Sequence, residues 1–166
     1  VAGIFKSVFG FPNPVNEVAA RMVAGMVVVL SLTIILSDQM WLTFVLGYGF
    51  LARVATGPTL SPMGLLATRV LVPLFGNPLR PVPGPPKRFA QAVGLVFSTT
   101  ALVLYLALDS MTASRVVLGV LTLFAALESG LGFCAGCYVF NQLMRLGLIP
   151  ESVCRECLAV DTTMTR

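Results

Sequence analysis

Long apolar stretches without charges dominate the hydropathy pattern of this chain. They cover residues 22–37, 40–52, 89–108 and 116–127, and the last continues past a single acid. A helix that crosses a bilayer needs about 20 mostly apolar residues. With flanking residues included, the pattern predicts four spans at about residues 18–36, 40–55, 89–108 and 114–137. The expected fold class is an all-α integral membrane four-helix bundle, built as a single membrane domain over residues 1–166.

Local signals place two segments between the second and third spans. Ser61 followed by Pro62 is typical of an N-cap with proline at the first helical position, so an interfacial helix is expected at about residues 61–75. Residues 77–88 contain five prolines and are predicted to form an extended, basic, semi-rigid loop.

The fourth helix and the tail after it carry the cysteines. Its apolar pattern continues beyond the bilayer, so the helix either projects into water or bends near Gly130 and Gly132. Gly147 can end it, and Pro150 can open a short C-terminal cytoplasmic helix in a cysteine-bearing tail at about residues 147–160.

Composition and charge agree with a membrane protein and predict its orientation. Residues are 57% hydrophobic and 11% charged, whereas soluble domains have about 25% charged residues. The net charge of +4 reflects basic residues beside apolar helices, so no nucleic-acid partner is expected. One side of the bilayer would carry Asp38, Asp109 and only one basic residue, Arg115. The opposite side would carry most of the basic residues, namely Lys6, Arg53, Arg69, Arg80, Lys87, Arg88, Arg145 and Arg155. The positive-inside rule then puts both termini and all cysteines in the cytoplasm.

Four cysteines form two CxxC pairs, Cys134/Cys137 and Cys154/Cys157. The spacing between the pairs fits a four-thiolate zinc site, and each pair alone fits a redox dithiol. A tail that returns from Gly147 could bring Cys154 alongside Cys137. The chain has no histidine, which excludes histidine-based triads and histidine ligands.

Two polar side chains share a helical face with the first pair. Asn141 and Arg145 follow Cys137 at helical spacing, and Arg88 with Lys87 is expected on the same side of the membrane. A nearby cation favours the thiolate form of a cysteine, so these residues are candidate supporting groups. In a reducing cytoplasm permanent structural disulfides are not expected.

Glu128 is an acid within the predicted fourth span. Such a group must face protein or water, and Arg21 on the first span is its expected partner. The pair would fix the register of two helices, and proton transfer is the alternative role.

Four sequence strings carry a resemblance to a known family. They are FGFPNPVN at 9–16, VPGPPKRFAQ at 82–91, GFCAGC at 132–137 and LIPESVCREC at 148–157. On these strings the chain resembles the bacterial membrane family catalogued as domain of unknown function 4395. The resemblance implies a multi-pass protein of the bacterial inner membrane with cysteine pairs as family features and no established activity. Its gene neighbourhoods imply a thioredoxin-like or rhodanese-like partner.

These observations leave three functional hypotheses. The first is a membrane-embedded relay that passes electrons or sulfane sulfur between the two pairs. The second is a non-enzymatic membrane protein with a structural zinc bound by Cys134, Cys137, Cys154 and Cys157. The third is a carrier of small sulfur compounds.

Overall fold

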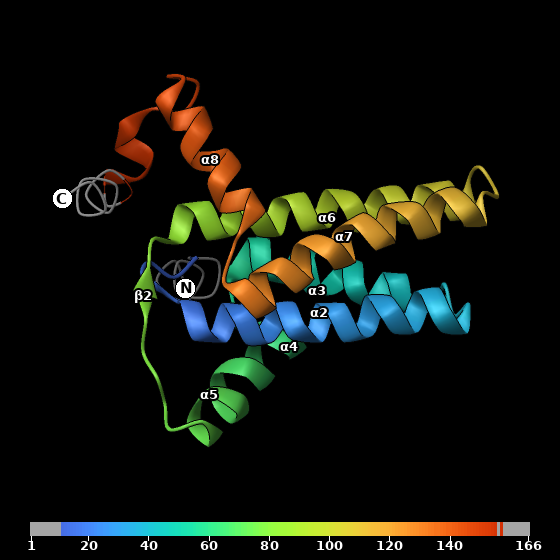
Figure 1. Ribbon diagram of the computed structural model, residues 1–166, viewed down its shortest axis with the longest axis horizontal. Coiled ribbons are helices and arrows are strands. Elements are labelled where there is room, and N and C mark those ends of the chain that lie inside the picture. Colours follow the sequence, from blue (N-terminus) through green and yellow to red (C-terminus); the bar gives the residue numbers. More distant parts are fainter. Residues whose placement is uncertain (1–10, 156, 158–166) are drawn as a thin grey trace, which may run out of the picture.

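The computed structural model describes residues 11–155 and 157, and it is all-α apart from one two-stranded sheet (Figure 1). Its bundle consists of α2 (Glu17–Ser37), α3 (Leu42–Thr56), α6 (Gly84–Leu106) and α7 (Met111–Leu131). Between α3 and α6 lie α4 (Pro62–Leu66), the π-helical turn η1 (Ala67–Leu71) and α5 (Val72–Leu74). After α7 come α8 (Ala135–Arg145) and the 3-10 turn η2 (Glu151–Val153). The strands β1 (Val15–Asn16) and β2 (Pro81–Val82) pair antiparallel.

Three of the described helices are long and apolar enough to cross a membrane, namely α2, α6 and α7 with 21, 23 and 21 residues. Large apolar side chains remain exposed on their outer faces, such as Leu36 at 80% and Val96 at 64%. An apolar surface of this kind fits a lipid environment. The second predicted span becomes α3, whose 15 residues give a length of about 22 Å. Fifteen residues are fewer than the about 17 that a spanning helix needs, so the second span is complete only with the hydrogen-bonded turn at Met40 and Trp41 that precedes α3.

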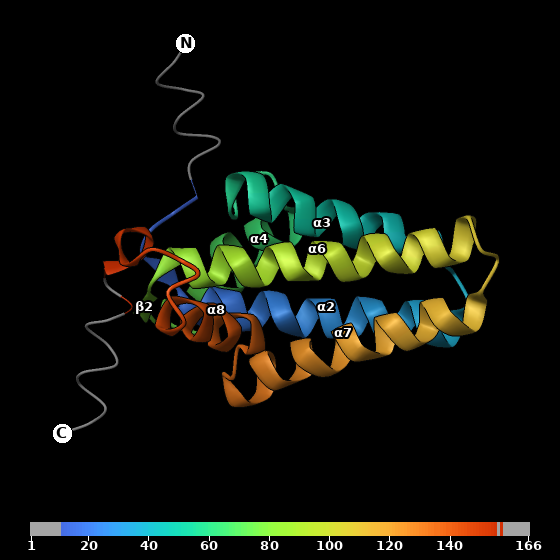
Figure 2. The same ribbon diagram turned by 90° about the horizontal axis from the view of Figure 1, so that it is seen from above.

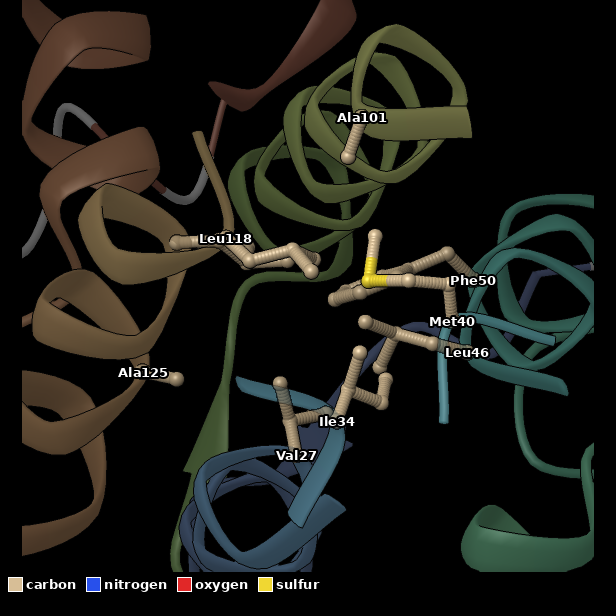
Figure 3. Close-up of a cluster of buried hydrophobic side chains, with 9 residues drawn as sticks. Val27, Ile34, Met40, Leu46, Phe50, Ala101, Leu118 and Ala125 are labelled. Atoms are coloured by element: carbon tan, nitrogen blue, oxygen red, sulfur yellow. The ribbon is translucent and has the colours of Figure 1, made fainter. Parts of the chain in front are cut away.

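The core of the bundle lies where α2, α3, α6 and α7 meet. Val27, Ile34, Leu46, Phe50 and Leu118 are among the buried side chains that point toward one another there (Figure 3). Hydroxyl groups connect the helices as well, because Thr122 donates to Ser31 at 2.8 Å and Ser114 donates to the carbonyl of Ala101 at 2.9 Å. Such interhelical hydrogen bonds supplement close packing within a bilayer.

The predicted proline-rich loop is shorter than the sequence indicated. Helix α6 begins at Gly84 and includes Pro85 and Pro86 in its first turn. Proline is tolerated there because its missing N–H group has no helical partner at that position. The extended segment therefore ends at residue 83, and Lys87 and Arg88 are helical.

The predicted interfacial helix is present as a helical segment, and the Ser61 side chain caps it by accepting from the Gly64 N–H group.

The predicted fourth helix bends at the glycine pair. Helix α7 ends at Leu131, and Gly132 adopts a left-handed conformation with φ of 71° that glycine accepts without strain. Helix α8 then leaves the bundle at an angle to α7 (Figure 1). Of the two alternatives expected from sequence, a projecting helix and a bend near Gly130 and Gly132, the structure has the bend, because α7 and α8 are separate helices.

Candidate thiol–disulfide site

The first cysteine pair forms the beginning of α8. Cys134 is the N-cap of this helix, and its sulfur accepts a hydrogen bond from the Cys137 N–H group at 3.3 Å. The two cysteines are joined as a disulfide with their Cα atoms 5.2 Å apart. The N-terminal end of a helix stabilises negative charge, so a reduced Cys134 is placed where a thiolate is favoured.

The second pair lies on the tail that returns beside α8. Cys154 is 5% exposed and packs against Phe140 and Met144 of α8. Cys157 is partly buried against the same cluster and is joined to Cys154 as a disulfide. The return of the tail after Gly147, expected from sequence, is confirmed by this packing (Figure 1).

A cavity of about 460 Å³ brings the two pairs together at one end of the bundle, and we call it the end cavity. Cys134, Cys137 and Cys157 all line it. Asn141 and Arg145, the supporting residues expected on the α8 face, line it too. The tail cysteine that shares this cavity with the first pair is therefore Cys157, whereas Cys154, the cysteine expected alongside Cys137, does not line it.

Of Lys87 and Arg88, the two neighbouring cations predicted near the thiols, only Lys87 lines the end cavity. Arg88 turns away, because its Nε donates to the carbonyl of Val54 at 3.0 Å and its guanidinium lies 5.9 Å from the centre of the Phe11 ring. Arg88 therefore does not line the end cavity, whereas Lys87, its neighbour on α6, does.

Glu128 forms an ion pair with Lys87 and not with Arg21. The Lys87 Nζ lies 2.7 Å from the Glu128 Oε1, and the two side chains are only 8% and 13% exposed. Arg21 instead donates to the carbonyl oxygens of Ser129 and Gly130, at 3.1 and 2.8 Å, and so caps the C-terminal end of α7. Sequence reasoning missed Lys87 as the partner because it placed this residue in a loop.

A second cavity of about 240 Å³ lies inside the bundle, and we call it the inner cavity. Its lining is apolar except for Gln91, Glu128 and Cys134. Cys134 thus borders both cavities, and the Lys87–Glu128 ion pair reaches from the end cavity, which Lys87 lines, to the inner cavity, which Glu128 lines. Cys134 and the Lys87–Glu128 ion pair therefore lie at the boundary between the two cavities.

Arg53 is a further polar residue in this region that the sequence analysis used only for its charge. Its side chain is buried, and its Nε and Nη1 donate to Gln91 at 2.7 Å and to Ser61 at 3.1 Å. The guanidinium also lies 4.6 Å from the centre of the Phe50 ring. Arg53 therefore fixes the orientation of Gln91 at the inner cavity. An arginine near the end of an apolar helix gives no sequence signal for such a contact.

The zinc hypothesis finds no preassembled site in the part of the chain that the structure describes. Among residues 11–155 and 157, no three side chains of Cys, Asp, Glu or His are grouped so that they could hold a metal ion. Each pair of cysteines is instead joined within itself.

Comparison with protein families identifies the chain. The model of a family described as a domain of unknown function, DUF4395, matches residues 15–145. The chain belongs to the DUF4395 family. The DUF4395 match includes the four bundle helices, α8 and the Cys134/Cys137 pair, and it ends at Arg145, before the Cys154/Cys157 pair. Comparisons with curated proteins and with solved structures find no match.

Proposed function

We propose that this DUF4395 protein is a membrane thiol–disulfide relay that passes an electron pair from Cys154/Cys157 to Cys134/Cys137. The observation that supports it is the end cavity, where Cys157 of the tail pair and both cysteines of the α8 pair share one space. Two redox-capable pairs that line one cavity can exchange disulfides once the tail brings Cys157 into contact with Cys137.

The order of the exchange follows from which cysteines line the end cavity. A dithiol protein of the thioredoxin type reduces Cys154–Cys157, becoming a disulfide itself. The Cys157 thiolate then attacks Cys137, which forms a Cys137–Cys157 bond and breaks the Cys134–Cys137 bond. Cys134 leaves as a thiolate, which the N-terminus of α8 and the Cys137 N–H group stabilise. Attack of Cys154 on Cys157 restores the tail disulfide and leaves Cys134/Cys137 as a dithiol.

The relay predicts that Cys137 and Cys157 are the contact between the pairs. The double variant Cys134→Ser/Cys154→Ser retains only these two thiols and should form an internal disulfide under mild oxidation. The matched variant Cys137→Ser/Cys157→Ser retains Cys134 and Cys154, and it should stay reduced because Cys154 does not line the end cavity. Mass spectrometry of peptides after alkylation measures both results. Equal bridging in the two variants would contradict the assigned order of attack.

The proposal includes an orientation, with the cysteines and both termini on the cytoplasmic side of a bacterial inner membrane. Asp38 and Asp109 lie in the two connections at the end of the bundle opposite to α8 (Figure 2). Arg115 forms an ion pair with Asp38 at that opposite end. Lys87 and Arg145 line the end cavity, which supports an orientation with this end in the cytoplasm.

Reporter insertions test this orientation. Alkaline phosphatase, which is active only outside the cytoplasm, should be active when inserted at Asp38 or Asp109 and inactive when inserted at Asn77, which lies before β2. We expect this pattern because the positive-inside rule retains the basic end. Activity at Asn77 with none at Asp38 would invert the membrane orientation and remove a cytoplasmic dithiol partner.

A further inference from the structure

The inner cavity has the composition of a site for a flat apolar molecule. Four phenylalanine rings line it, Phe50, Phe89, Phe97 and Phe124. Ligand sites are typically apolar and aromatic, with a few polar groups that fix orientation. Here those groups are Gln91, Glu128 and Cys134, so the one reactive atom of the lining is a disulfide sulfur.

The inner cavity is open toward the outer surface of the bundle. Phe124 of α7 and Val139 of α8 line it and are nevertheless 38% and 46% exposed. Both of these side chains are apolar, and Leu123, which precedes Phe124 on α7, is 58% exposed. A molecule dissolved in the lipid can therefore enter from the side without passing through water.

One polar residue that lines the inner cavity, Gln91, carries a donor that can bind a carbonyl oxygen. Arg53 donates to the Gln91 Oε1 at 2.7 Å, which occupies the acceptor of this amide. The amide nitrogen then remains as a donor on a residue that lines the inner cavity, among few other polar lining residues. A lipid acyl chain cannot accept a hydrogen bond from this donor, because its hydrocarbon part carries no acceptor.

We propose that the inner cavity binds the ring of a lipid-soluble quinone, which oxidises the Cys134/Cys137 dithiol that the proposed relay produces. The Cys134 thiolate attacks a ring carbon and forms a sulfur–carbon bond. Cys137 then attacks the Cys134 sulfur, so that the disulfide forms, the sulfur–carbon bond breaks and the electron pair stays on the ring. The two thiol protons go to the quinone oxygens, which gives a quinol. The Lys87–Glu128 ion pair, which reaches from the end cavity to the inner cavity, is placed to pass these protons.

A pair of neighbouring alanines provides the test. Ala125 lines the inner cavity and points toward the bundle interior (Figure 3), whereas Ala126 is exposed. Ala125→Phe should fill the cavity, and Ala126→Phe adds the same ring outside it. Val139→Trp would block the opening from a surface position and so guards against a folding failure of the first variant. Each reduced protein, in lipid nanodiscs, is mixed with menadione, and quinone absorbance and free thiols are followed.

Wild type and Ala126→Phe should lose two thiols per menadione reduced, at a rate that saturates with menadione. Ala125→Phe and Val139→Trp should react at least about tenfold more slowly, because the ring loses its bound position beside Cys134. Equal rates in all four proteins, or a rate linear in menadione, would overturn the site. In a Cys134→Ser/Cys154→Ser background the cavity variants should still form the Cys137–Cys157 disulfide. If the Cys137–Cys157 disulfide did not form but oxidation by menadione still saturated, the relay would be contradicted and the quinone site would stand.

Discussion

Lys87→Met should lower the free energy of unfolding by about 3–5 kcal/mol, because it leaves the Glu128 carboxylate buried without its cation. The two side chains are 8% and 13% exposed, so solvent does little to compensate for the lost partner. Methionine retains the length and apolar stem of lysine, which limits any loss of packing. The stability is measured as helix loss during titration of the micelle-bound protein with a denaturing detergent.

The second half of this experiment isolates the interaction between Lys87 and Glu128. The double variant Lys87→Met/Glu128→Gln should regain most of the lost stability, since no unpaired charge remains. The exposed pair of Arg115 and Asp38, at 40% and 57%, is the control, and its disruption should cost about 0–1 kcal/mol. Strictly additive losses at Lys87 and Glu128 would show that the pair contributes nothing. Glu128→Gln combined with Arg21→Met should give no such recovery.

Gly136→Ala should destabilise the docking of α8 on α6 by about 1–3 kcal/mol through overpacking. A Cβ atom at Gly136 would lie 2.7 Å from the Cα atom of Ala90, and a backbone atom cannot move aside as a side chain can. Because Gly136 lies between the cysteines of the first pair, displacement of α8 should also slow the formation of the Cys137–Cys157 disulfide.

The control for this variant is Gly119→Ala on α7, where a Cβ atom would meet nothing within 4 Å. Alanine is favoured over glycine within a helix by about 0.5–1 kcal/mol, so this variant should be slightly more stable than wild type. A loss of stability in Gly136→Ala together with a gain in Gly119→Ala supports close packing of α8 on α6. A gain in stability at Gly136 would mean that the two helices are not in contact there.

Sequence reasoning succeeded where the determining interactions are local. Hydropathy predicted the long helices, and Ser61 predicted the start of α4, since a cap depends on a few adjacent residues. It failed at Pro85 and Pro86. The number of prolines in this segment indicated a loop, but the first turn of a helix accepts proline, and α6 begins at Gly84.

The candidate site could be predicted only in part. The cysteine spacing identified both pairs, but two contacts depend on how separate helices pack. Lys87 reaches Glu128 from a helix that begins earlier than expected, and the turn of the tail presents Cys157 instead of Cys154 to the end cavity. Neither outcome follows from spacing along the chain, because both depend on distances between elements far apart in sequence.

The location of both cavities at one end of the bundle has an energetic consequence. Cys157, Cys134 and the inner cavity all lie near the α8 end, and the acidic connections lie at the other. In the proposed reaction the electron pair and the two protons therefore enter from the same side of the bilayer and stay there. No net charge crosses the membrane, so the oxidation of thiols by quinone would be electroneutral and would neither consume nor build the transmembrane potential.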